Sequence, residues 1–414
     1  MPFLNGLQRI ALYLFFFSIN FEVVRPFPSV DLAASRIIGV LYFLLILPEY
    51  KSFFRTDRIK SFLIPLALFY VFLTFMGLLN MNEFNDKVFD SSILLNLIFF
   101  WVMINHERKE YMILEKSMLF FALGGLVVAL FYLAGIGTVY TEGRLSMFGD
   151  DQNYVGFRTS VATIILVLAV LQNRLKMGWF RFLLPIPIPL MLKLISETGS
   201  RGALISFLMT FVVGIILFNT ANIWKKIAIQ ITGILMLLIV GAYLIETGTM
   251  KNRLENSIES GDTAGRTEIW QHLLQIIAKH PVAGIGQTGY SYELTTIYGK
   301  EVAAHNVILE ILCYTGVVGL SFYLFFLFKI GLSSYEVYKR TSFLLPILLL
   351  IPILGMILSI QILTKKIGWV IFAYIVSSMA VKEPNRHELI KKNILPDPLK
   401  PMFIQEMKSD LKTR

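Results

Sequence analysis

The sequence predicts an all-α, polytopic integral membrane protein with about twelve transmembrane helices. Of its 414 residues, 56% are hydrophobic and 16% are charged, and the mean hydropathy is +0.66. These values lie far outside the usage of a soluble globular domain. Apolar runs of spanning length recur along the chain, and basic loops alternate with less basic ones between them.

Each apolar run of about 20 residues can form a helix that crosses the hydrocarbon core. The first run is predicted to be a span and not a signal peptide, because no polar segment with a small-residue cleavage site follows it. The predicted spans are 7–24, 30–48, 61–79, 88–105, 113–136, 155–171, 178–195, 202–218, 224–245, 304–328, 342–361 and 366–381.

The loops after the even-numbered spans are short and rich in lysine and arginine, and so is the tail at 382–414. Cytoplasmic loops carry such an excess. Both termini are therefore predicted in the cytoplasm, with 1–381 as a single membrane domain. Lys365 and Lys366 run against this rule, because they fall in an outer turn. The formal charge of +10 is assigned to membrane orientation and not to nucleic-acid binding. The single cysteine, Cys313, excludes an internal disulfide.

The outer face receives the loops that carry the unusual residues, and one of them is much longer than the rest. This long interval, 247–303, contains the amphipathic run Ile269–Ile277, which predicts a helix along the membrane surface with Trp270 at headgroup depth. Pro281 ends this helix, and three glycines that follow permit turns. The other outer loops are 21–29, 80–89, 138–154 and 196–201.

Three outer loops bring an arginine to the same surface. The first is Arg144, which precedes Asp150, Asp151 and Asn153. The two aspartates could either be solvated by water or bind a ligand. Asn153 could bind substrate or cap the sixth span.

The second arginine, Arg201, follows Ser200 at the start of the eighth span, among small residues. A helix N-terminus offers unpaired N–H donors and a partial positive charge, so this loop predicts an anion site. The alternative is an arginine that snorkels to the interface. Its outer position, where positive charge is disfavoured, favours ligand binding.

The third arginine, Arg266, stands just before the amphipathic helix and is predicted to contact the substrate. His305 and Asn306 follow at the entry to the tenth span. An interfacial histidine is more often a structural group than a catalyst. Nearby arginines would disfavour its proton, however, and leave a neutral imidazole that can accept one.

A metal site is the rival interpretation, since four outer side chains could share it: His272, His280, Glu293 and His305. Their spacing matches no zinc signature, and no paired carboxylate accompanies them. Phosphate-binding glycine loops and nucleotide fingerprints are also missing from the sequence. We therefore expect no metal and no cofactor, and a nucleotide-sugar donor is disfavoured.

Several short motifs follow one another on the predicted outer face. They are Ser200-Arg201-Gly202, Gly265-Arg266 with Trp270, His280-Pro281 with Gly284-Ile285-Gly286, and His305-Asn306 with Leu309, Gly316 and Gly319-Leu320. In this order the sequence resembles the O-antigen ligase and O-antigen polymerase superfamily of bacterial envelope enzymes. Arg144 with Phe148-Gly149 and Asn153 is similar to an earlier loop of that family, but Asp150-Asp151-Gln152 replaces its usual proline-containing run.

The resemblance implies a membrane glycosyltransferase of the bacterial inner membrane, similar in arrangement to the lipid-linked-sugar (GT-C-like) transferases. Its donor would be a saccharide on undecaprenyl diphosphate, and its acceptor a hydroxyl of another glycan. Arg201 and Arg266 would hold the diphosphate, and His305 would activate the acceptor or assist the leaving group. The remaining substrate-binding candidates are Arg144, Asp151, Asn153, Ser200 and Asn306.

Polymerase is favoured over ligase, although these residues do not separate the two reactions. A polymerase would extend another lipid-linked repeat unit, with a chain-length regulator as a further partner, whereas a ligase would use a lipid A core. A transporter or flippase for a lipid-linked or anionic solute is the alternative of another class. It rests on charges in or near spans, Arg36, Arg158 and Lys193, and on prolines that break the seventh span, Pro185, Pro187 and Pro189.

Overall fold

The computed structural model describes residues 2–26, 32–57, 59–82, 88, 90–218, 222–246, 248–259, 265–300 and 302–379. The predicted tail at 382–414 lies outside these residues, as do parts of the outer loops 21–29, 80–89 and 247–303.

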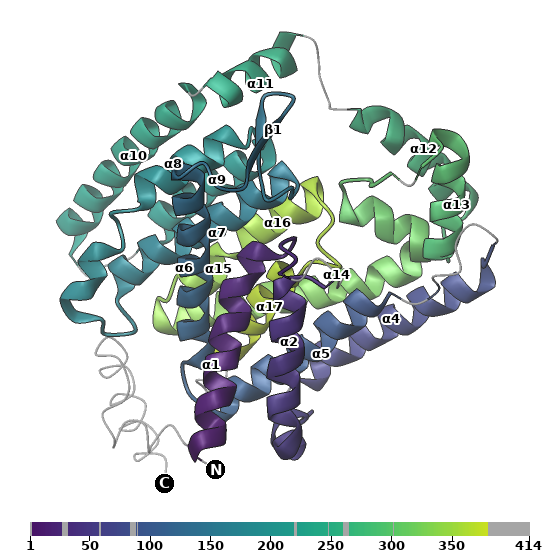
Figure 1. Ribbon diagram of the computed structural model, residues 1–414, viewed down its shortest axis with the longest axis horizontal. Helices are drawn as coiled ribbons and strands as arrows, with labels where there is room; N and C mark the ends of the chain where they lie inside the picture. Colours follow the sequence, from purple (N-terminus) through teal and green to yellow (C-terminus); the bar gives the residue numbers. More distant parts are fainter. Residues whose placement is uncertain are drawn as a thin grey trace.

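The described chain is a bundle of helices, drawn in Figure 1 with the start of the chain at the bottom. A helix lies over each predicted span, and six helical segments of the described chain are long and apolar enough to cross a membrane. The predicted class, a helical membrane protein, is therefore confirmed. The helices are α1 (Pro2–Ser18), α2 (Ala34–Ile46), α4 (Lys60–Leu79), α5 (Ser91–Lys109), α6 (Ile113–Leu133), α7 (Gln152–Gln172), α8 (Ile188–Glu197), α9 (Arg201–Leu217), α10 (Ile223–Glu246), α14 (Val307–Thr341), α16 (Leu350–Ser359) and α17 (Lys366–Ser378).

Helix α7 is the centre of the bundle, and most of its residues are buried. It packs against α6, α8 and α9, while α14 packs against α4 and α17 on another side of the molecule. By contrast, α10 packs mainly along α9 and leaves most of its apolar side chains exposed. Short pieces connect these helices: η1 (Ile19–Phe21), η2 (Leu47–Glu49), α3 (Tyr50–Phe53) and α15 (Leu345–Leu348).

The seventh predicted span is broken, as its prolines indicated. A 3₁₀ helix, η3 (Gly178–Leu183), is followed by a turn, and α8 begins only at Ile188. Proline has no N–H to donate and clashes with the preceding turn, so a continuous helix cannot form through Pro185 and Pro187.

The long interval is more ordered than the sequence predicted. It contains three helices, α11 (Gly248–Glu259), α12 (Arg266–Lys279) and α13 (Gly286–Tyr298). The predicted amphipathic helix is α12, which packs on α14 through Leu273 and Ile276, both buried. Helix α13 packs against α4 and α14. These three helices form a folded cover on the end of the bundle where α7, α9 and α14 begin, called the loop end below (Figure 1).

The cover is joined to α14 at a break in that helix. Gly316 has φ 56° and ψ −160°, which interrupts the helical hydrogen bonds. The amide of Val317 instead donates to the carbonyl of Pro281 at 2.9 Å, and that of Val318 to the carbonyl of Val282 at 3.2 Å. A side chain at Gly316 would collide with the carbonyl of Val282, so only glycine allows this approach.

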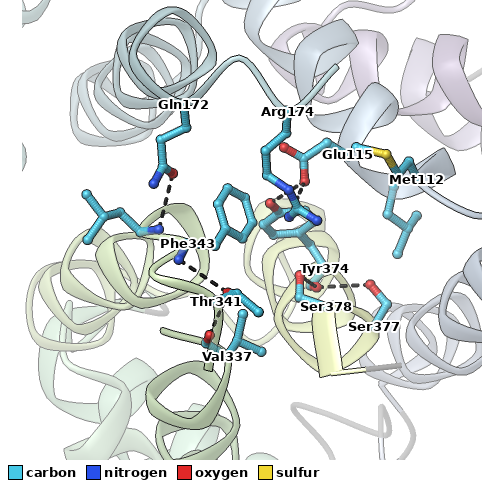
Figure 2. A network of polar contacts seen from close by, with 12 residues as sticks. Met112, Glu115, Gln172, Arg174, Val337, Thr341, Phe343, Tyr374, Ser377 and Ser378 are labelled. Atoms are coloured by element: carbon cyan, nitrogen blue, oxygen red, sulfur yellow. Dashed lines mark hydrogen bonds and ion pairs between the residues drawn. The ribbon is translucent and has the colours of Figure 1, made fainter. Parts of the chain in front are cut away.

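A polar network holds the opposite end of the bundle together (Figure 2). The Tyr374 hydroxyl donates to Glu115 Oε2 at 2.7 Å, and Arg174 Nη1 lies 3.5 Å from the same oxygen. The Arg174 guanidinium also stacks on the Phe343 ring, 3.9 Å from its centroid. Gln172 donates to the carbonyl of Ser342. Arg174, one of the basic residues that set the predicted orientation, is therefore also a structural link between α6, α7 and α17.

Candidate active site

Four arginines from four separate elements share one site at the loop end. They are Arg144 in strand β2 (Arg144–Met147), Arg201 at the first position of α9, Arg253 in α11 and Arg266 at the first position of α12. Burial lowers the pKa of Arg144, and the positive charges of Arg253, Arg266 and Arg201 lower it further. Burial, followed by the charge of Arg201, likewise lowers the pKa of Arg266. The site therefore concentrates positive charge.

A β-hairpin positions Arg144. Strand β1 (Thr138–Thr141) pairs antiparallel with β2, with Thr141 opposite Arg144. Glu142 and Gly143 form the two-residue turn, and both have positive φ, as in the hairpin turns that match strand twist. The all-α prediction missed this hairpin. The available signal was an acidic residue followed by glycine, directly after the β-branched and aromatic run Thr138–Thr141.

Arg144 is held by two hydrogen bonds in addition to the hairpin. Its Nε donates to the carbonyl of Thr198 at 3.0 Å, and its Nη2 donates to Asn153 Oδ1 at 3.1 Å. The carboxylate of Asp151 caps α7 by accepting from the amide of Asn153 at 2.8 Å. The alternative role predicted for Asn153, the helix cap, therefore belongs to Asp151.

The loop before α9 caps that helix and packs against Arg144 and Arg253. Ser200 caps α9 through its hydroxyl, and the Arg201 guanidinium hydrogen-bonds the Ser257 hydroxyl of α11. Gly199 has φ 58°, and a Cβ there would lie 3.4 Å from the Cγ atoms of both Arg144 and Arg253. Gly199 therefore lies between these two side chains.

Arg253 is the site residue that sequence reasoning missed. Its Nε is buried and has no hydrogen-bond partner among the residues that the structure describes. In the sequence it stands in a polar run with other charges, such as Lys251 and Glu255. No pattern there separates it from its solvent-exposed neighbours.

His305 lies at the entry to α14, where the charges of Arg266 and Arg144 act on it. It is half-buried with φ 52°, and the preceding carbonyl of Ala304 accepts a 2.8 Å hydrogen bond from the Trp270 indole. Asn306 caps α14 by accepting from the amides of Ile308 and Leu309. Trp270 thereby ties α12, and with it Arg266, to the segment that carries the histidine.

The environment favours the neutral form of His305. Burial lowers its pKa below 6.5, and the charges of Arg266 and Arg144 lower it further, whereas Asp151 opposes them. The Asp151 carboxylate also raises the pKa values of Arg144 and Arg266. It is a shared counter-charge for the cluster.

A buried ion network lies beside the site and accounts for charges that the sequence left open. Asp150 pairs with Arg158, and Glu22 pairs with Lys366 at 2.8 Å and lies 3.8 Å from Arg158. These pairs explain Lys366 of the outer turn and the arginine inside a predicted span. The Lys365 ammonium stacks on the Tyr154 ring, 4.5 Å from its centroid.

The four side chains of the alternative metal interpretation do not form a metal-binding group. His272 Nδ1 lies 2.5 Å from the Tyr298 hydroxyl. In the described part of the chain, no group of three His, Cys, Asp or Glu side chains could hold a metal ion.

The arrangement is suited to a polyanionic ligand beside a proton acceptor. Guanidinium groups bind phosphate oxygens through paired donors. At a partly buried site they stabilise negative charge that develops on a leaving group better than water would. A neutral imidazole can take the proton of an attacking hydroxyl.

Residues 186–324 match a family model that is described as O-Antigen ligase. No curated protein matches the chain. The matched segment contains Arg201, Arg253, Arg266 and His305, and Arg144 lies before it. The match supports the resemblance to the O-antigen ligase and O-antigen polymerase superfamily over residues 186–324.

Proposed function

We propose that the protein is a glycosyltransferase that takes a saccharide from an undecaprenyl-diphosphate donor at the outer face of the bacterial inner membrane. The observation that carries this proposal is the cluster of four arginines, of which Arg266 and Arg144 act on the charge of His305. Three of the four lie in the segment that matches the family model. Twelve spans in a GT-C-like arrangement, with both termini in the cytoplasm, would place this cluster on the outer face.

The proposed reaction follows from the charges. The arginines hold the diphosphate, Arg201 and Arg266 being the contacts expected from the sequence. As the bond between sugar and diphosphate breaks, the diphosphate takes the electron pair and gains negative charge, which the guanidinium groups stabilise. The acceptor hydroxyl forms the new bond to the sugar and gives its proton to neutral His305. No step calls for a metal or a nucleotide sugar.

The acceptor decides between the two family reactions. A ligase would use a glycan on lipid A core, and a polymerase another lipid-linked repeat unit. The matching family model is one of O-antigen ligases, so the ligase reaction has at least as much support as the polymerase reaction that the sequence favoured. The bond-forming chemistry is the same in both.

Deletion of the gene tests this proposal and distinguishes between the two acceptors, lipid A core and a lipid-linked repeat unit. Unattached lipid-linked polymer would indicate a ligase, whereas single repeat units still attached to lipid A core would indicate a polymerase. Unchanged surface glycan would contradict both reactions.

Complementation with variants tests the residues. Arg201→Ala and His305→Ala should each reduce transfer about 30- to 1000-fold, the value of one strong transition-state contact, with normal protein amount in the membrane. Lys251→Ala, an exposed charge on α11, is the matched control and should retain activity. Transfer should also survive excess chelator, and chelator-sensitive activity would revive the metal interpretation.

A further inference from the structure

Three tyrosines and one glutamate, called the tyrosine cluster below, lie at the loop end outside the arginine cluster. Tyr132 is in the last turn of α6, Tyr140 is in β1, Tyr243 is in the last turn of α10, and Glu197 is the last residue of α8. These elements meet around α8, which packs against α6, β2, α10 and α11. The proposed reaction gives none of the four side chains a role.

The polar groups of the tyrosine cluster interact with one another. The Tyr132 and Tyr140 hydroxyls share a hydrogen bond, and the charge of Glu197 acts on both. Tyr243 also acts on Tyr132. Burial raises the pKa of Tyr140, and the Glu197 carboxylate raises it further. The Tyr140 hydroxyl therefore keeps its proton at neutral pH and remains a hydrogen-bond donor.

A threonine of α11 connects the tyrosine cluster to the arginine cluster. The Thr249 hydroxyl oxygen lies 3.3 Å from Glu197 Oε2 and 3.2 Å from the carbonyl oxygen of Gly143 in the hairpin turn. A Cβ at Gly199 would lie 3.2 Å from Thr249 Cγ2 and 3.4 Å from Arg144 Cγ. The two clusters are therefore neighbours, and they meet at Gly199 and the hairpin turn.

The tyrosine cluster is accessible from outside the protein. The Tyr140 side chain is 55% exposed and that of Tyr243 is 44% exposed, while Tyr132 and Glu197 are half-buried. Tyrosines at the ends of apolar helices are common at a membrane surface, where they serve as anchors. Tyr140, however, stands on a strand between two predicted spans, and a half-buried carboxylate such as Glu197 costs desolvation energy without contributing to an anchor.

This combination of groups matches a sugar. The C–H faces of a saccharide pack on aromatic rings, and its hydroxyls donate to carboxylates and exchange hydrogen bonds with tyrosine hydroxyls. A carboxylate accepts about four hydrogen bonds, so the contact with Thr249 leaves capacity on Glu197. Because Glu197 would repel a second carboxylate, the cluster suits a neutral or amino sugar and disfavours an acidic one.

We propose that Tyr132, Tyr140, Tyr243 and Glu197 form a saccharide subsite, which binds a neutral or amino sugar of the glycan whose transfer the arginine cluster supports. The inference rests on the proposed glycosyltransferase function and deepens it. The reacting sugar lies at the arginines and His305, whereas the subsite holds a sugar farther along the chain. Donor and acceptor glycans share this chemistry, and two probes distinguish them.

Binding of free oligosaccharides to the purified full-length protein tests the subsite. Mild acid releases one probe from the lipid-linked intermediates of the cell and the other, the core oligosaccharide, from the lipopolysaccharide of the deletion strain. Neither probe carries a diphosphate, and binding is measured by saturation-transfer NMR. Tyr140→Ala and Glu197→Gln should each weaken binding about five- to tenfold, the effect of one aromatic face or one charge-assisted hydrogen bond. Tighter binding of the first probe would identify the donor glycan, and tighter binding of the second the acceptor glycan.

Matched controls remove the same groups elsewhere. Tyr335→Ala, at a 52% exposed position toward the other end of α14, and Glu293→Gln, an exposed carboxylate of α13, should bind as the wild type does. Tyr140→Phe keeps the ring and should lose less affinity than Tyr140→Ala. Equal binding in the cluster variants and the controls, or binding of neither probe, would overturn the proposal. Binding is measured without turnover, so failure of the subsite would leave the effect of gene deletion on surface glycan unchanged, and the two proposals can fail separately.

Discussion

At the scale of single residues, the ionisation of His305 decides whether it can accept a proton. Its pKa lies below 6.5 because of burial and because of the Arg266 charge. If the neutral imidazole is the base, activity is present above this pKa and is lost as the pH falls through it. The profile of transfer against pH should therefore show an acidic limb below 6.5.

Two variants should move that limb in opposite directions. Arg266→Gln removes a positive neighbour, so the pKa of His305 rises and the limb of the residual activity moves to higher pH. Asp151→Asn removes the opposing negative charge, so the limb moves to lower pH, while asparagine can still cap α7. A limb that stays in place in both variants would exclude His305 as the titrating base.

Arg253 gives a second prediction at this scale. Arg253→Gln should reduce transfer by about ten- to 1000-fold, because a guanidinium with a buried free donor is placed to bind the diphosphate. The melting temperature of the Arg253→Gln variant, measured without added substrate, should not fall. The substitution removes one of four positive charges that repel one another. Lys251→Gln, an exposed residue on the same helix, should transfer normally. Unchanged activity in Arg253→Gln would remove it from the site.

Some residues of the candidate site could be predicted from the sequence, and others could not. Arg201 and His305 were expected because they stand at span ends, Arg144 because it stands in an outer loop, and Arg266 because it precedes an amphipathic helix that the sequence predicts. The pairing of Asp150 with Arg158 was not, because it depends on side-chain directions that a span boundary does not fix.

At the scale of elements, the strongest test concerns the break in α14. Gly316→Ala places a side chain against the carbonyl of Val282 at a φ that disfavours it. We expect a loss of about 1 to 3 kcal/mol in the free energy of unfolding, measured as a lower melting temperature of the purified protein.

Gly331 in the same helix is the matched control. Nothing lies within 4 Å of a Cβ at that position, so Gly331→Ala should be neutral or should stabilise the protein by up to about 1 kcal/mol. Equal melting temperatures for the two variants would mean that the docked segment does not constrain Gly316.

The elements that the sequence did not predict share a physical cause. Helices α11 and α13 are short, and α13 begins with Gly286 and ends before Gly299, so little in its local pattern separates it from a loop. Packing against α4 and α14 holds it in place. The apolar runs of the spans, by contrast, carry their own signal, because the bilayer requires long hydrophobic helices.

At the scale of the whole molecule, cysteine labelling can test the predicted orientation in the membrane. The one cysteine, Cys313, is buried, so it gives an unreactive background for labelling. A Thr141→Cys variant, exposed beside the hairpin turn, should react with a membrane-impermeant maleimide added to intact spheroplasts. Lys51→Cys, an exposed position at the other end of the bundle, should react only after permeabilisation. The reverse pattern would contradict the predicted orientation and would place the arginine cluster in the cytoplasm.

The manner in which the cover is attached has a consequence for how such proteins can diverge. The bonds at the break run between main-chain groups of Pro281, Val282, Val317 and Val318, and the Val282 side chain is 60% exposed. Exposed side chains of the cover, such as that of Val282, can therefore change without loss of these main-chain bonds, provided that the backbone course and Gly316 persist. Natural variants could in this way acquire new acceptor preferences through the cover alone, on an unaltered membrane bundle.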